Sequence, residues 1–175
     1  MTVIINCTLT TALLVLLLGI APLQALDTSS GFGLQDRALF QERVDYTLTN
    51  QSGADFHGQD LASTSFAGAV GRGANFSEAN LSGAILTQGA FAEAVFRGAD
   101  LSDALMDRAD FADTDLRDAV LSGVIASGSS FRNALIEGAD FSDALLDKED
   151  MRRLCQDASG VNSRTGIATS DSLGC

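Results

Sequence analysis

The sequence has 175 residues, nearly half of them apolar, with 17 glycines, one proline and no tryptophan. This length favours a single domain with a sizeable core. The formal net charge of −12 argues against a nucleic-acid-binding protein, because such proteins need a basic surface. The same charge fits an acidic surface that keeps a protein soluble or attracts basic partners.

The N-terminal segment, residues 1–25, carries no charged side chain and is largely apolar from Thr11 onward. The apolar run is too short for a comfortable membrane span, and it ends in small residues with Ala25 before a candidate cleavage point. We therefore predict a secretory signal peptide over residues 1–25, with an uncleaved anchor as the alternative. The missing Lys or Arg at its start and Leu23 before the cleavage point weigh against it. In either interpretation the rest of the chain is exported. If the signal peptide is cleaved, we expect no stable membrane span in the mature protein.

Residues 26–53 precede a regular repeat and are predicted to form an N-terminal cap segment. Leu34 to Tyr46, "LQDRALFQERVDY", fits a short helix or an irregular cap. A cap is needed because an open coil end invites stacking with another chain.

The repeat itself has a period of five residues. From Phe56 to Leu146 a large apolar residue, here called the centre, recurs in five-residue steps, and Ala stands two places before most centres. A helix would scatter these centres around every face, and a strand would alternate them between two faces. The period therefore indicates a chain that turns every five residues and points each centre inward.

A slower repeat of 20 residues shows how the turns combine. "ANLSGAIL" begins at Ala79, "ADLSDALM" at Ala99 and "ADFSDALL" at Ala139. Four pentapeptides thus make one four-sided coil, and about five coils stack about 4.8 Å apart. Small centres at Gly71 and Ala126 predict slight irregularity there. The centres form four columns: Phe56, Phe76, Phe96, Leu116 and Ile136 on the first side; Leu61, Leu81, Leu101, Leu121 and Phe141 on the second; Phe66, Leu86, Met106, Ala126 and Leu146 on the third; Gly71, Phe91, Phe111 and Phe131 on the fourth.

This pattern resembles the pentapeptide repeat family, whose usual unit is Ala-(Asp/Asn)-(Leu/Phe)-polar-Gly; "GANFSEANLSGA", residues 73–84, is close to that unit. The resemblance covers residues 54–146. It implies an all-β solenoid, specifically a right-handed quadrilateral β-helix. The resemblance is specific for fold and says little about function.

Residues 147–175 are predicted to form a C-terminal capping helix and tail. "DKEDMRRLCQDASG" supplies the helix, Asp147 can cap it and Gly160 ends it. Its apolar stripe would sit on the last coil and consists of Met151, Leu154, Cys155 and Ala158.

The cysteines support an exported chain. Cys7 falls within the predicted signal, which leaves Cys155 and Cys175 as an even pair. An even pair in an exported chain favours one disulfide, with two unrelated thiols as the alternative. Two cysteines without a nearby histidine make a zinc site improbable.

The tail resembles the C-terminal end of thylakoid-lumen pentapeptide repeat proteins of cyanobacteria and chloroplasts. In that group the two tail cysteines are expected to pair. The resemblance implies location in the thylakoid lumen, with the periplasm second. The residues that carry it are Ile136 to Ala144, Leu154-Cys155, Gly160, Asn162, Thr165-Gly166, Thr169 and Ser172 to Cys175.

Catalytic chemistry is not predicted. His57 is the single histidine and follows a centre, so we expect it at the surface. Asp100, Asp110, Asp115 and Asp140 precede centres, where the repeat favours Asp or Asn, so they are expected to serve the turns rather than acid–base catalysis or calcium binding. We predict no enzyme activity, no cofactor and no metal site.

One outward column breaks the polar rule. On the third side the residue before each centre is aliphatic, at Ile85, Leu105, Ile125 and Leu145. We call these four residues the apolar strip and interpret them as a candidate interaction surface. The alternatives are plain sheet surface or a strip covered by a terminal segment.

The leading function hypothesis is a non-catalytic lumenal protein-interaction or scaffold module. Its partner would be an unidentified protein and not a nucleic acid, and the strip also permits a weak homo-oligomer. The alternative is an acidic rod that mimics DNA and inhibits a DNA-binding enzyme, which fits the charge of −12 but not an export signal. An enzyme is the least favoured class.

Overall fold

The computed structural model describes residues 44–175. The predicted signal peptide, Cys7 and the part of the predicted N-terminal cap before residue 44 lie outside this range. Two helices are present in it, α1 (Lys148–Asp157) and α2 (Thr169–Leu173).

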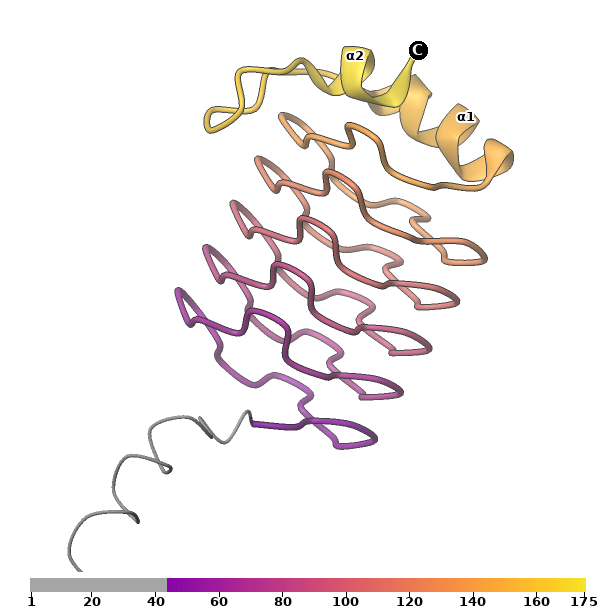
Figure 1. Ribbon diagram of the computed structural model, residues 1–175. Helices are drawn as coiled ribbons and strands as arrows, with labels where there is room; N and C mark the ends of the chain where they lie inside the picture. The colour runs from indigo at the N-terminus through magenta and orange to yellow at the C-terminus, as the bar shows by residue number, and fades with distance from the viewer. Residues whose placement is uncertain (1–43) are drawn as a thin grey trace, which may run out of the picture. The chain divides into compact units, whose positions relative to one another are not determined.

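Before α1 the chain forms stacked coils of 20 residues (Figure 1). Parallel bridges join each outward residue to the one 20 positions later, from Asp45 with Ser65 to Ile125 with Leu145. Within the described residues these bridges are isolated and no extended strand forms, because the chain turns after every bridge. The chain thus repeats in coils of 20 residues, as expected for a solenoid, but its β-structure consists of single bridges and not of strands.

Hydrogen bonds along the stack and within the turns explain the repeat unit. The Phe91 N–H donates to the Asp110 carbonyl of the next coil at 2.8 Å. At the turns, the Asp100 Oδ1 accepts from the Ser102 N–H at 3.0 Å and from its hydroxyl at 2.7 Å. The residue after each such pair has positive φ, as at Asp103 (57°) and Gly83 (63°). Asp, Asn and Gly recur because they satisfy these turns.

The centres fill the interior as four columns, as predicted. The rings of Phe56, Phe76 and Phe96 stack in the first column at 4.8 Å spacing, which matches the expected distance between coils. In the fourth column Phe91, Phe111 and Phe131 stack at 5.5 Å. The alanine layer is buried beside the centres, so a narrow coil holds one large residue per side.

Two expectations about the coils need correction. Coil contacts begin at Asp45 and not near residue 54, and Tyr46 stacks on Phe66 at 4.7 Å as the first member of the third column. The bridges continue beside both small centres, at Val70 next to Gly71 and at Ile125 next to Ala126, and the Phe91 ring lies 2.6 Å from where a Cβ at Gly71 would stand. The neighbouring phenylalanine therefore fills the space that Gly71 leaves.

Helix α1 lies on the last coil (Figure 1). Leu154 is 5% exposed and packs on the core, with Cys155 and Ala158 beside it. The predicted ends differ in two ways. Asp147 stands at the N-cap, but its carboxylate accepts from the Gly128 N–H at 2.8 Å and makes no cap bond. The helix ends at Asp157, with Ala158 as C-cap in place of Gly160.

The tail after α1 folds back onto the second side of the coils. Buried Asn162 donates from Nδ2 to the carbonyls of Ala119 at 3.1 Å and Gly138 at 2.8 Å. An antiparallel bridge between Val161 and Ala168 closes a hairpin around it. Asn162 therefore fastens the hairpin to backbone carbonyls of two successive coils.

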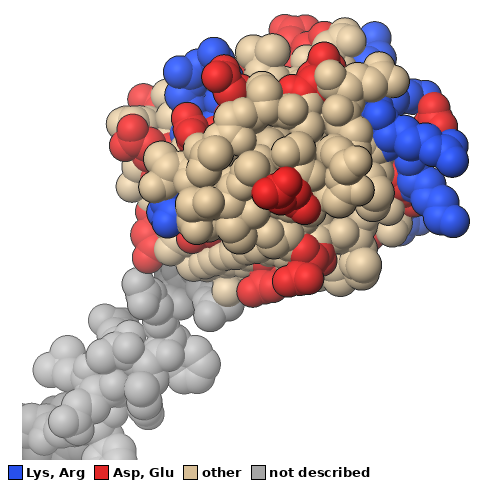
Figure 2. Space-filling model, turned by 90° about the horizontal axis from the view of Figure 1, so that it is seen from above, with Lys and Arg blue, Asp and Glu red and all other residues tan. Residues whose placement is uncertain are grey.

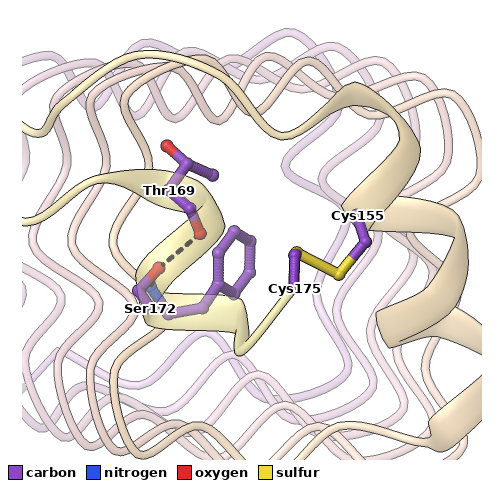
Figure 3. The surroundings of a disulfide bond; sticks show 5 residues. Cys155, Thr169, Ser172 and Cys175 are labelled. Carbon is purple, nitrogen blue, oxygen red and sulfur yellow. Dashed lines mark hydrogen bonds between the residues drawn. A yellow bond between two sulfur atoms is a disulfide. The ribbon is translucent and has the colours of Figure 1, made fainter.

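The predicted disulfide joins Cys155 of α1 to Cys175, with 5.6 Å between the Cα atoms (Figure 3). It encloses the hairpin and α2, whose Leu173 is 5% exposed and packs on the core beside Leu154. The tail is thus held by side-chain packing, by Asn162 and by a covalent bond to α1.

Thr169 in α2 provides a stability test with an unusual sign. Its side chain is fully buried, and its hydroxyl has no hydrogen-bond partner among the described residues. Burying an unpaired hydroxyl costs free energy, so Thr169→Val is expected to leave the free energy of unfolding unchanged or raise it by about 1 kcal/mol. Urea unfolding of the oxidised protein measures the change.

Thr114→Val is the matched control for this substitution. Thr114 is equally buried, but its hydroxyl donates to the Phe111 carbonyl at 2.8 Å. Its loss is expected to cost about 1 kcal/mol. Equal destabilisation by both substitutions would show that the Thr169 hydroxyl does have a partner.

Candidate functional site

The apolar strip forms a continuous outward column on the third side. Parallel bridges join Ile85 to Leu105, Leu105 to Ile125 and Ile125 to Leu145. The inward neighbours Leu86, Met106 and Ala126 are buried and Leu146 is partly buried against the core, so the strip and the core lie on opposite faces of the same coil wall. The structure therefore brings the four predicted residues together in one line.

The strip is accessible to a partner. Leu105 is 36% exposed and Leu145 is 59% exposed, while Ile85 and Ile125 are half-buried. The tail hairpin lies on the second side, where Val120 is only 6% exposed at the corresponding outward position. Among the described residues, the terminal segment therefore covers another side and leaves the strip open.

Two further exposed aliphatic residues at the outward position of the coils were not predicted from the sequence. Val70 on the fourth side is 42% exposed and Leu135 on the first side is 52% exposed, both directly before a centre. The rule that identified the strip, an aliphatic residue where Asp or Asn is usual, would have found them. They are isolated within their columns, since Asp115 lies below Leu135 and Ala90 lies above Val70.

The predicted surface residues serve the turns. His57 is exposed, and its N–H donates to Asp55 Oδ1 at 3.1 Å. Asp110 Oδ1 accepts from the Ala112 N–H at 3.0 Å, and Asp115 Oδ1 accepts from the Arg117 N–H at 3.2 Å. Over residues 44–175 the structure contains no cluster of three metal-ligating side chains. These contacts account for the aspartates as turn residues.

Asp140 differs from the other turn aspartates because the tail covers it. Burial acts to raise its pKa, but hydrogen bonds from the Ser142 hydroxyl and N–H and from Thr165 hold the pKa below its ordinary value. The carboxylate therefore stays ionised at neutral pH.

Ion pairs on the first side gather around one carboxylate. Asp115 lies 2.7 Å from Arg117 and 3.0 Å from Arg97. These two arginines thus neutralise part of the acidic surface of the coils.

In the part of the chain that the structure describes, no helix is long and apolar enough to cross a membrane.

Comparisons with known proteins agree with this geometry. Two family models described as pentapeptide repeats match the chain, one over residues 52–88 and 114–152 and the other over residues 72–115. No protein with a curated description matches it.

Solved structures include clear relatives. A pentapeptide repeat protein from the thylakoid lumen of Arabidopsis thaliana is 39% identical, with 74% of this chain and 90% of that chain covered and a TM-score of 0.54. HetL, involved in heterocyst differentiation regulation in the cyanobacterium Nostoc sp. strain PCC 7120, is 26% identical, with a TM-score of 0.57. That match covers 58% of this chain and 45% of HetL.

A more distant match is QnrB1, a plasmid-mediated fluoroquinolone resistance protein, at 21% identity and a TM-score of 0.29 over 58% of this chain and 55% of that chain. This likeness carries no argument about function.

Solved members of the family form right-handed quadrilateral β-helices and are generally non-catalytic. With its repeats, its coil stack and its similarity to the lumen protein, the chain belongs to the pentapeptide repeat family.

Proposed function

We propose that the protein is a non-catalytic protein-interaction or scaffold module of the thylakoid lumen that binds a partner through the apolar strip. Location in the lumen is supported by the similarity to the Arabidopsis thaliana lumen protein and by the disulfide, which suits an oxidising compartment. The charge-free start of the chain supports export through a signal peptide over residues 1–25. The periplasm is the second location.

The observation that carries this proposal is the exposed strip. A row of aliphatic side chains is exposed to solvent at the outward position before the centre, where this repeat elsewhere prefers Asp, Asn or Ser. Regular exposed apolar surface of this kind marks contact sites for proteins. Four side chains make a small patch, which suits a weak contact or one part of a larger interface.

A double substitution tests the strip. Leu105→Asp with Ile125→Asp places two charges in its middle while the inward centres stay unchanged. We expect a folded protein, by circular dichroism and thermal unfolding, that no longer retains its partner from a lumen extract. Quantitative mass spectrometry of the retained proteins and sedimentation of the purified chain measure partner binding and self-association.

Val70→Asp with Ala90→Asp is the matched control, since it adds the same charge to neighbouring coils on the fourth side. The control is expected to retain the partner. If the strip variant retains it as well, the strip is ordinary coil surface. The alternative function, an acidic rod that inhibits a DNA-binding enzyme, predicts inhibition of such an enzyme by the wild-type and the strip variant alike.

A further inference from the structure

The ladder of hydrogen bonds between coils stops at residues 131–136. One coil earlier, the N–H groups of Phe111, Asp113 and Leu116 each donate at 2.8 Å to a carbonyl of the next coil. Their equivalents in the last coil are the N–H groups of Phe131, Asn133 and Ile136. These three donors find no acceptor within residues 44–175, and the Ala134 carbonyl likewise finds no donor.

The reason is that α1 stands where the next coil would lie. Its backbone groups bond within the helix, so it covers the core without continuing the ladder. The tail restores the ladder only on the neighbouring side. There the Gly138 N–H donates to the Ser159 carbonyl at 2.8 Å, and the Phe141 N–H donates to Ser172 Oγ at 3.0 Å.

A groove gives access to this open edge. A cavity of about 340 Å³ lies beside residues 133–137, with Arg117 on one side and Asp157 of α1 on the other. A second cavity of about 200 Å³ lies between residues 131–136 and the residues around Arg153 and Leu154 of α1. Both are lined by Ala134, Ile136 and Asp157, so they form one groove along the edge.

The groove favours a positively charged occupant. Three arginines line the groove and each has a carboxylate partner: Arg117 pairs with Asp115 at 2.7 Å, Arg153 with Glu149 at 3.2 Å and Arg132 with Asp113 at 3.7 Å. The two carboxylates that line it, Glu137 and Asp157, make no ion pair within residues 44–175. Asp157 also stands at the C-terminal end of α1, whose last turn has no basic residue. The partial negative charge of a helix C-terminus adds to both carboxylates.

The surface around this end carries charges of both signs. Basic side chains gather at its margin, and acidic side chains lie at the margin and near the middle of the face (Figure 2). The chain as a whole carries −12, so a cationic segment is attracted over a distance as well as at the groove.

We propose that an extended segment of a partner protein, carrying Lys or Arg, adds to this edge as one further bridge. A residue of the segment would pair with Leu135 as Leu135 pairs with Asp115, its N–H donating to the Ala134 carbonyl and its carbonyl accepting from the Ile136 N–H. The existing bridge supplies the geometry, since the Leu135 N–H donates to Thr114 at 2.9 Å and the Leu116 N–H to Leu135 at 2.8 Å.

Backbone bonds to an open edge give such a contact its affinity, and side chains give its specificity. The cation of the segment would meet Asp157 and Glu137. This groove is separate from the apolar strip, so the inference stands whether or not the strip binds a partner.

The test uses the full oxidised chain and a fluorescein-labelled peptide, Gly-Val-Lys-Val-Gly with blocked ends. Fluorescence anisotropy is expected to show binding that weakens at least about tenfold in Glu137→Lys with Asp157→Lys. The matched control is Glu78→Lys with Asp103→Lys, which changes the net charge equally at exposed turns of earlier coils. The control is expected to bind nearly as well as the wild-type.

Two further measurements separate edge pairing from charge attraction. The same peptide with its central amides N-methylated lacks the N–H that Ala134 would accept, and it is expected to bind at least about tenfold more weakly. Amide exchange at Ile136 is expected to slow in the complex. No binding to the wild-type, equal loss in groove and control variants, or undiminished binding of the methylated peptide would each overturn the proposal.

Discussion

Phe111→Ala is expected to lower the free energy of unfolding by about 3–5 kcal/mol, as truncation of a buried aromatic does. The side chain is fully buried between coils. Its ring stacks on Phe91 and Phe131 at 5.5 Å each and meets Phe96 edge-on at 5.8 Å. Neighbours fixed by the ladder on both sides cannot collapse into the cavity. Urea and thermal unfolding measure the loss.

Asp110→Ala is the neighbouring control. Asp110 is exposed and its side chain makes one turn bond, to the Ala112 N–H at 3.0 Å. The substitution is expected to cost about 0.5 kcal/mol or less. Similar losses for the two variants would contradict the register in which residue 111 points inward and residue 110 outward.

Removing the disulfide is expected to have the second largest effect. Cys155 and Cys175 lie 20 residues apart in sequence, and a cross-link of that length contributes about 3 kcal/mol by restricting the unfolded chain. It connects α1 to the end of the tail and no pair of coils. Reduction, or Cys175→Ser, should therefore speed amide exchange in residues 160–175 while exchange in the coils stays slow.

The single and double variants check this expectation against each other. Cys155→Ser, Cys175→Ser and the double variant remove the same bond, so their losses should agree within about 0.5 kcal/mol. A much larger loss for Cys155→Ser would mean that its packing on the core outweighs the cross-link. Melting of the coils upon reduction would contradict a role confined to the tail.

The repeat predicted which residues form the core because each pentapeptide has the same environment. Phe76, Leu81 and Phe91 differ in size and side, yet each is fully buried one residue after an outward position. The boundary near residue 54 was wrong because Gln51 stands at a centre. At the first described coil a polar centre interrupts the apolar pattern, although the Gln51 N–H still donates to Val70 at 2.7 Å.

The sequence predicted the helix and the disulfide of the C-terminal end, but not where the tail packs on the coils. The apolar stripe of α1 and the cysteine pair were visible in the sequence; Leu154, Cys155 and Ala158 pack on the core as predicted, Met151 is not among the residues packed there, and the cysteines form the disulfide. The position of the tail depends on Asn162, which bonds to carbonyls of Ala119 and Gly138. A local pattern cannot show which of four similar sides will receive such a side chain.

The exposure of the candidate surfaces was likewise only partly predictable from the sequence. Val120 and Leu145 occupy the same outward position of the repeat, and by sequence alone they are equivalent. Val120 is 6% exposed beside the tail and Leu145 is 59% exposed. The five-residue period was enough to predict the inward columns, since it decides whether a residue points inward or outward. The tertiary structure decided which outward residues remain free and where the ladder ends, because both depend on where α1 and the tail pack on coils distant in sequence.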